Sequence, residues 1–300
     1  MDDLVILTGP TASGKSEVCE IISNEVACRV INCDSKQIYC DVPIITDQPT
    51  SMSCGYYRLY GYVSPSQNYS AGLWLEDAKK EIQNARQDGL LPIVIGGSGL
   101  YINALLNGLS DIPQVSKEVR DRAIDLLSTM GKDAFYEMLV KMDKNAKKLH
   151  KNNSHQILRA FEVMEQTGIS IFTWRTQSAR VRPFRNYKIF VLMPSREVLY
   201  SKINRRFLHM MSSAAIDEVK LLMSMNLPEN LPIMRAHGVP EIVKYLSGTM
   251  GFDEAIEIAQ KNTRHYAKRQ CTWFRTQLPS SASYFADKHQ LAQHIIRLYT

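Results

Sequence analysis

The sequence predicts an α/β protein: a doubly wound parallel sheet containing a phosphate loop (P-loop), with an inserted helical domain. Short apolar strand patterns alternate with helical patterns over residues 1–112. Strand patterns then vanish between residues 113 and 186, and one returns at residues 187–193. We therefore expect a P-loop nucleoside-triphosphate-hydrolase-like core made of residues 1–112 and 187–300, with residues 113–186 as the insertion.

The first strand pattern, residues 4–7, leads into the motif GPTASGKS and then into a helical pattern at residues 17–27. Strand, glycine loop and helix are the context that a phosphate loop requires. Its glycines let backbone N–H groups wrap closely around an anion. Lys15 adds a positive charge, and the Ser16 hydroxyl can bind Mg²⁺. We expect a diphosphate or triphosphate to be bound by Gly9, Pro10, Thr11, Ala12, Ser13, Gly14, Lys15 and Ser16.

The second strand pattern, residues 29–34, ends in Asp34. Ligands of open parallel sheets bind beyond the carboxyl ends of the strands, so Asp34 is expected at the same edge as the phosphate loop. Three roles remain open for its carboxylate: a helix cap or turn residue, a Mg²⁺ ligand, or a general base or hydrogen-bond acceptor for a substrate. A strand pattern at residues 90–95 runs into a second glycine loop, where Ser98 either belongs to a tight turn or adds a hydroxyl to the same cleft.

Between these strands, residues 41–69 are rich in Pro, Tyr, Ser and Gly and predict a long irregular loop. Residues 70–89 predict a helix that Ser70 caps, with one apolar face that belongs to the core. Glu76 and Lys80 on this helix are spaced for an ion pair. In the C-terminal part, the pattern predicts helices near residues 214–225, 238–247 and 253–277.

Charge is divided unevenly along the chain. Residues 1–112 contain 7 Lys and Arg against 13 Asp and Glu, whereas residues 113–300 contain 29 against 17. Basic residues concentrate at 141–159 and 175–188, beside aromatic residues. Such runs are usually solvated faces, but two of them in one helical module favour contact with RNA or DNA.

The six cysteines form no C-x-x-C pair, which argues against a zinc site and against a disulfide framework. No apolar run has the length of a membrane span, and the acidic start of the chain predicts no secretory signal. We expect a cytosolic protein with reduced thiols.

Four blocks together resemble the tRNA dimethylallyltransferases, the bacterial-type family that prenylates adenine 37 beside the anticodon. They are GPTASGKS at 9–16, DSKQIY at 34–39, GGSGLY at 96–101 and AKRQCTWFR at 267–275. The resemblance runs nearly end to end and includes HQILRAFEV at 155–163. It implies that the phosphate loop binds dimethylallyl diphosphate rather than using ATP, with Mg²⁺ as cofactor. It also implies transfer of the dimethylallyl group to N6 of a tRNA adenine by a cytoplasmic enzyme, which we expect to be a monomer.

The resemblance also assigns residues. Asp34 matches the family's general base, Ser98 stands where the family usually has Thr, and Arg120 matches an Arg that neighbours the reacting groups. The implied tRNA-binding set is Asp34, Ser35, Lys36, Gln37, Ser98, Arg120, Gln156, Ile157, Leu158, Arg159 and Ala160. Arg120 pairing with a helix acid, and a structural role for Gln37, remain open alternatives.

Four segments depart from the family pattern or leave their role open. Ile157 replaces the first Arg of the helix segment that contacts tRNA. Residues 235–241 match a tRNA-facing loop without its usual aromatic residue, and residues 56–58 lack the common His-His. The basic and aromatic helix at 264–275 is either part of the site or mostly core and surface.

Two other functions remain open. A nucleotide or metabolite kinase of the same fold would need an acceptor site for an ATP γ-phosphate, and the basic insertion would have no purpose. An RNA-binding switch protein that responds to a nucleotide would not need Asp34 to act as a base.

Overall fold

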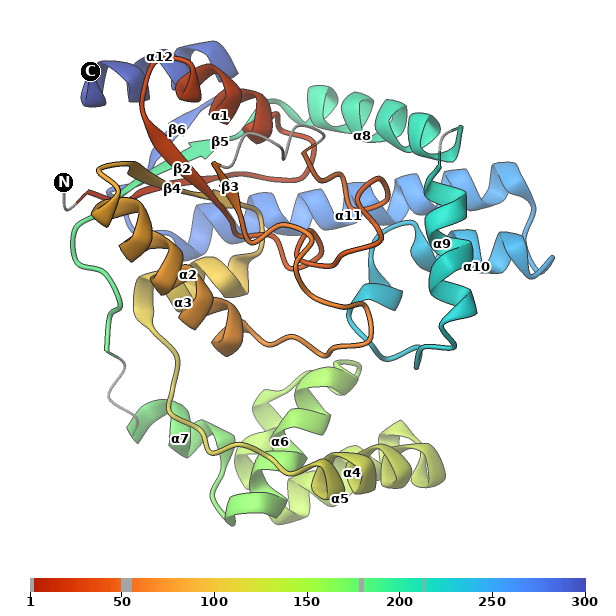
Figure 1. Cartoon of the computed structure of the whole chain (residues 1–300). Coiled ribbons are helices and arrows are strands. Elements are labelled where there is room, and N and C mark those ends of the chain that lie inside the picture. The colour runs from red at the N-terminus through yellow and green to blue at the C-terminus, as the bar shows by residue number, and fades with distance from the viewer. Residues whose placement is uncertain (1–2, 50–55, 178–180, 213) are drawn as a thin grey trace. The chain divides into compact units, whose positions relative to one another are not determined.

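The computed structural model describes residues 3–49, 56–177, 181–212 and 214–300 (Figure 1). The chain divides into two compact units, one made of Met1–Leu106 and Pro183–Thr300 and the other of Asn107–Arg182. These boundaries fall a few residues before those expected from the strand pattern. Cys54 and Arg180 lie outside the described residues.

The first unit is built on a parallel sheet. Among the described residues it has six strands in the order β3-β2-β4-β1-β5-β6. The four central strands are almost entirely buried, which is why they appear in the sequence as continuous apolar runs. The strands are β1 Val5–Thr8, β2 Cys28–Asn32, β3 Tyr57–Arg58, β4 Leu91–Gly96, β5 Lys188–Leu192 and β6 Ser283–Phe285.

Helices cover both faces of this sheet, as a doubly wound fold requires (Figure 1). On one face, α1 (Lys15–Ser23) and α12 (Lys288–Tyr299) share an apolar core with the strands. On the other face lie α2 (Ala71–Gln87) and α3 (Gly99–Asn107), where Trp74 stacks on Tyr101 with ring centroids 4.5 Å apart. The predicted fold class is therefore confirmed.

The other helices of this unit come from its C-terminal part, and α11 packs against α8 and α10 (Figure 1). Among the described residues they are α8 Arg196–Met211, α9 Ala215–Ser224, the 3₁₀ turn η3 Ile233–Arg235, α10 Val239–Leu246 and α11 Phe252–Gln277. The predicted helices near residues 214–225, 238–247 and 253–277 are confirmed.

Details of three elements differ from the prediction. The first helix starts at Lys15, inside the phosphate-loop motif, and ends at Ser23 rather than near residue 27. The predicted irregular loop contains β3, which the pattern misses because the strand is only 2 residues long. Ser70 caps α2 as predicted, but the expected Glu76–Lys80 ion pair is wrong. Glu76 instead pairs with Lys79 at 2.8 Å, because i+3 and i+4 neighbours lie equally close on a helix.

Helices are the only regular secondary structure among the described residues of the second unit, which has its own apolar core. Phe135 and Phe161 meet in this core with ring centroids 5.1 Å apart. Ser116 and Asn153 cap their helices, and Gly168 ends one in the left-handed conformation at φ 66°. The elements are α4 Lys117–Met130, α5 Lys132–Met142, η2 Lys144–Lys148, α6 Ser154–Thr167 and α7 Ile171–Gln177. In neither unit does a described helix combine the length and the apolar character needed to cross a membrane.

Candidate active site at the carboxyl edge of the sheet

The phosphate loop joins β1 to α1 in a conformation that depends on its glycines. Gly9 has φ 156°, and a Cβ there would lie 2.3 Å from the carbonyl oxygen of Leu192 in β5. Gly14 caps α1 at φ 102°, and Ala12 also adopts a positive φ of 61°. The loop therefore presents the N-terminus of α1 toward the space beyond the sheet, where an anion is stabilised by free N–H groups.

Lys15 lies folded against this loop. Its Nζ donates to the Pro10 carbonyl at 2.8 Å and to Ser13 Oγ at 3.4 Å. Burial lowers the pKa of Lys15 to about 8, an effect that the charge of Asp34 opposes and that of Arg206 reinforces. Burial makes the charged form of Lys15 unfavourable. An anionic ligand beside it would stabilise that charge and raise its pKa again.

Two residues on distant helices hold the loop from outside. Arg206 on α8 donates through Nη2 to Thr11 Oγ1 at 2.7 Å. Gln270 on α11 accepts from the Thr11 N–H at 2.9 Å and donates to the Gly97 carbonyl at 2.8 Å. Sequence reasoning missed both roles, because no local pattern links residues so far apart along the chain.

Asp34 follows β2 at the same edge. Its Oδ1 accepts from the Lys36 N–H at 2.9 Å, so the turn role is present. Asn32 fixes the Asp34 backbone by accepting from its N–H at 2.8 Å and donating to its carbonyl at 3.1 Å. The charge of Asp34 also acts on Lys15 and Lys36. The turn thus holds the carboxylate beside the phosphate loop, and this role is compatible with a chemical one.

Ser98 connects the second glycine loop to the Asp34 turn. Its Oγ accepts from the Ser35 N–H at 2.9 Å and lies 3.3 Å from Ser35 Oγ. The glycines beside it are needed for close approach, since a Cβ on Gly96 would lie 2.2 Å from the Cys33 carbonyl. A Cβ on Gly97 would lie 2.4 Å from Gln270 Nε2. Ser98 therefore belongs to a tight turn and also places a hydroxyl at this edge of the sheet.

Lys36 and Gln37 use their side chains within the protein. Lys36 Nζ donates to the Pro232 carbonyl at 2.5 Å, and burial lowers its pKa to about 8. Gln37 Nε2 donates to the carbonyls of Thr46 and Asp47 at 3.1 and 2.5 Å. The structural role left open for Gln37 is thus observed.

Helix α11 and the turn before α10 add aromatic and basic groups. His237 and Tyr266 have ring centroids 4.5 Å apart, and the Arg269 guanidinium lies 5.7 Å from the Tyr266 ring centroid. Burial, together with the positive charges of Lys36, Arg269 and Arg206, lowers the pKa of His237 to about 4. Val239, in the loop that lacks the family's usual aromatic residue, is fully buried.

A hollow of about 700 Å³ lies along one face of α11. It is lined by His265, Lys268, Arg269, Thr272, Trp273, Thr276 and Gln277.

The remaining expected residues belong to the helical unit. Arg120 is exposed on α4, and Gln156 is exposed on α6. Arg159 forms an ion pair with Glu162 at 3.2 Å. Ile157 and Ala160 are buried in the core of this unit, and their assignment to tRNA binding stays a prediction. Leu158 is partly buried against the same core.

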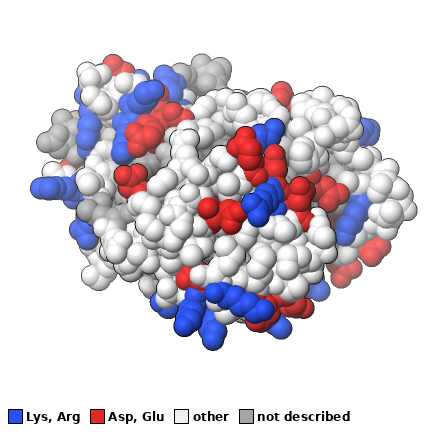
Figure 2. Space-filling view, turned by 90° about the horizontal axis from the view of Figure 1, so that it is seen from below, with Lys and Arg blue, Asp and Glu red and all other residues white. Residues whose placement is uncertain are grey.

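On the face seen in Figure 2, the basic side chains do not form one continuous patch. Figure 2 shows Lys and Arg interspersed with Asp and Glu on the face seen there. In the helical unit, Lys148 and Arg175 lie over Phe172, with their charged groups 5.4 and 5.9 Å from the ring centroid.

The side chains at this edge could bind Mg²⁺ only together with a phosphate ligand. Ser16 is exposed in the first turn of α1. Across the described parts of the chain, no group of three or more His, Cys, Asp and Glu could hold a metal ion. Mg²⁺ commonly uses few protein ligands and completes its shell with substrate phosphates and water, so Ser16 and a bound diphosphate would suffice.

Comparison with known proteins identifies relatives over the whole chain. A family model described as IPP transferase matches residues 37–277. The chain is 61% identical over 297 residues to the tRNA dimethylallyltransferase of Anaplasma phagocytophilum, covering 99% of this chain and 95% of the relative. It is 52% identical over 301 residues to the enzyme of that name from Anaplasma marginale strain St. Maries, covering 100% and 99%.

Solved structures agree. The tRNA isopentenylpyrophosphate transferase of Bacillus halodurans superposes with a TM-score of 0.70 at 30% identity, covering 99% of this chain and 95% of that one. A eukaryotic dimethylallyltransferase captured acting on tRNA superposes with a TM-score of 0.79. At 24% identity, over 99% and 78% of the two chains, this second likeness supports the fold. The chain therefore belongs to the IPP transferase family, the family of the tRNA dimethylallyltransferases.

Proposed function

We propose that this chain transfers a dimethylallyl group from dimethylallyl diphosphate to N6 of adenine 37 in tRNA and releases diphosphate. Membership of the family supports a prenyltransferase that acts on tRNA. One observation carries the finer proposal: the phosphate loop, Asp34 and Ser98 meet at one edge of the sheet, with the charge of Asp34 acting on Lys15.

The phosphate loop would hold the leaving group. The N6 atom forms a bond to C1 of the donor while the C1–O bond breaks, and the electron pair leaves with the diphosphate. Negative charge develops on that group, so fixed positive charges beside it lower the barrier. Lys15 and the loop N–H groups would supply this stabilisation, and Arg206 lies close enough to share in it. Mg²⁺ on Ser16 would neutralise part of the same charge.

Asp34 would take the proton that the amine loses. A positioned carboxylate within hydrogen-bond reach of the reacting amine is the requirement for a general base. Asn32 and the Lys36 N–H fix the turn and orient one carboxylate oxygen. Ser98 holds the same turn through Ser35. We assign contact with the target nucleotide to this turn, through Asp34, Ser35, Lys36 and Gln37.

The adenine must leave its stack to reach this turn. Extrusion costs least from a single-stranded loop, which suits the anticodon loop. We assign further tRNA contacts to the helical unit, through Arg120, Gln156 and Arg159. Because the acceptor is tRNA, we propose that the enzyme acts in the cytoplasm. We also propose that it acts as a monomer.

Mixing the protein with unmodified tRNA and labelled dimethylallyl diphosphate tests the proposal. We expect label in the RNA, and none in a tRNA that carries guanine at position 37. Label that enters both RNAs equally would contradict the assignment to adenine 37. ATP turnover without labelled RNA would favour a kinase or a switch protein.

A further inference from the structure

A carboxylate shares Arg206 with the phosphate loop. The Arg206 guanidinium binds the phosphate loop through Thr11, and its Nη1 donates to Asp47 Oδ2 at 2.6 Å. The charge of Asp47 also acts on Lys15. A diphosphate that arrives at the loop is repelled by this carboxylate and competes with it for Arg206, because both are anions that bind guanidinium through charge-assisted hydrogen bonds.

Asp47 is held in place by its backbone. It adopts φ 59°, a conformation that is uncommon for residues other than glycine. Its carbonyl and that of Thr46 accept hydrogen bonds from Gln37 Nε2. On the other side of the segment, the carboxylate of Glu218 on α9 accepts from the N–H groups of Ile44 and Ile45, each at 2.8 Å. The segment is thus anchored on α9 and on Gln37, and also through Gln48, whose Nε2 donates to the Tyr39 carbonyl at 2.8 Å. The contact with Gln37 is the one among these that involves the carbonyl of Asp47 itself.

We propose that Asp47 gates the donor site. It occupies Arg206 until an acceptor nucleotide engages Gln37, which releases the carbonyls of Thr46 and Asp47 and lets the carboxylate turn away. This inference rests on the proposed function, in which Gln37 contacts the nucleotide. The Asp47 side chain is 51% exposed, so solvent receives it when it leaves Arg206. By linkage, binding of tRNA and of the donor then strengthen each other equally.

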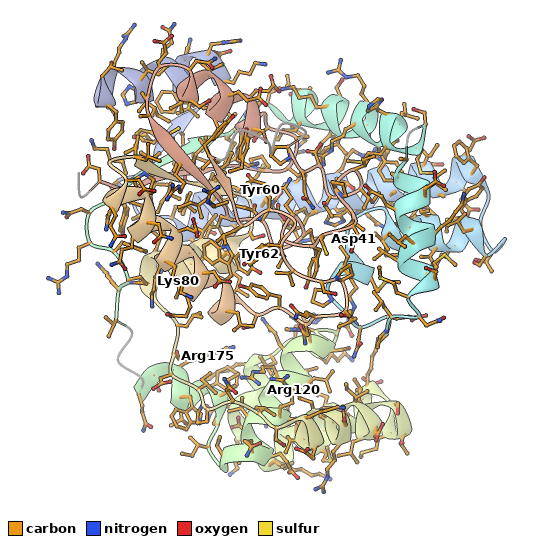
Figure 3. The ribbon with its side chains drawn as sticks, viewed as in Figure 1. Asp41, Tyr60, Tyr62, Lys80, Arg120 and Arg175 are labelled. Carbon is orange, nitrogen blue, oxygen red and sulfur yellow. The ribbon has the colours of Figure 1, made fainter. Side chains whose placement is uncertain are left out.

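Binding of inorganic diphosphate with Mg²⁺ to the full chain, measured by calorimetry, tests the gate. Asp47→Asn removes the charge and keeps a residue that tolerates positive φ. The matched control is Asp41→Asn. Asp41 is an exposed carboxylate of the same loop with φ 65°, labelled in Figure 3. We expect Asp47→Asn to lower the Kd for diphosphate about fivefold. This is the effect of removing the repulsion between two unit charges about 4 Å apart in a medium with the dielectric constant of water. The control should match the wild type.

An anticodon stem-loop RNA tests the link to the acceptor. It should tighten diphosphate binding by the wild type and leave binding by Asp47→Asn unchanged. Without RNA, Gln37→Ala should lower the Kd as Asp47→Asn does, and the double variant should show no further gain, since both changes release the same contact. In an Arg206→Ala background, the gain from Asp47→Asn should become smaller, because the competition for Arg206 is gone and only the direct repulsion of the diphosphate by the carboxylate remains.

Several results overturn the gate. Unchanged or weaker binding by Asp47→Asn shows that the carboxylate positions Arg206 rather than competing with the ligand. If Gln37→Ala leaves the Kd for diphosphate unchanged, or if the RNA still tightens diphosphate binding by Asp47→Asn, then the acceptor does not act on the gate through Gln37. Label transfer by the wild type is measured in parallel. If the wild type transfers label while these results appear, the gate fails and the proposed function stands; absent transfer means that the proposed function itself has failed.

Discussion

Replacing Lys15 with methionine should make the free protein more stable while removing its donor site. Lowering a pKa from 10.5 to about 8 corresponds to about 3 kcal/mol of unfavourable free energy for the charged form. The substitution also removes the hydrogen bond from Nζ to the Pro10 carbonyl, whose net worth is about 1 kcal/mol. We therefore expect Lys15→Met to raise the free energy of unfolding by about 2 kcal/mol at pH 7.

The pH dependence of this difference has a defined sign. The pKa of Lys15 is lower in the folded protein than in the unfolded chain, so the folded protein loses its proton first. The buried charge therefore destabilises the folded protein fully below pH 8. This destabilisation decreases as pH rises from 8 toward 10.5, so the free energy of unfolding of the wild type increases over that range. The advantage of Lys15→Met should therefore shrink between pH 7 and pH 9.5.

Urea unfolding at both pH values measures this advantage, and calorimetry with inorganic diphosphate measures the lost affinity. Lys80→Met is the matched control, because Lys80 is an exposed lysine on α2 (Figure 3). It should change neither quantity. A Lys15→Met protein that is no more stable than the wild type at pH 7, or that binds diphosphate equally well, would refute the reasoning.

Three other outcomes are expected. Asp34→Asn should slow transfer by about 10²- to 10⁴-fold in single-turnover assays while tRNA affinity, measured by filter binding, stays within a few-fold; a near-normal rate would remove the base assignment. Affinity for tRNA should fall steeply with added salt, as counterion release requires, and a flat response would contradict the basic helical contacts. Gly97→Ala should destabilise the protein by about 1–3 kcal/mol in urea unfolding, because its Cβ would lie 3.0 Å from the Gly9 carbonyl oxygen and 2.4 Å from Gln270 Nε2, which would have to leave its buried hydrogen bonds. Gly251→Ala, with open space around its Cβ, is the control, and equal stabilities would contradict the close approach.

The sequence predicts what depends on neighbours along the chain. The phosphate loop, Asp34 and Ser98 each directly follow a buried strand, so knowing that the strands are parallel is enough to bring them to one edge. The helix cap at Ser70 is equally local.

The missed contacts depend on tertiary packing. Arg206 and Gln270 lie 195 and 259 residues from Thr11, so no local pattern connects either of them to the phosphate loop, even though Gln270 belongs to the AKRQCTWFR block. Asp47 belongs to a loop without periodicity, so its contact with Arg206 follows only from the fold. Ile157 and Ala160 illustrate the opposite limit of sequence reasoning. A family resemblance marks a helix segment, but burial decides which of its side chains remain available.

The hydrogen bonds of Gln270 have a consequence for biosynthesis. This one side chain braces Thr11 against Gly97, and it belongs to a helix near the end of the chain. During translation, the first strands and both glycine loops leave the ribosome long before their brace. In a nascent chain, the two glycine loops therefore lack this brace until α11 has been made.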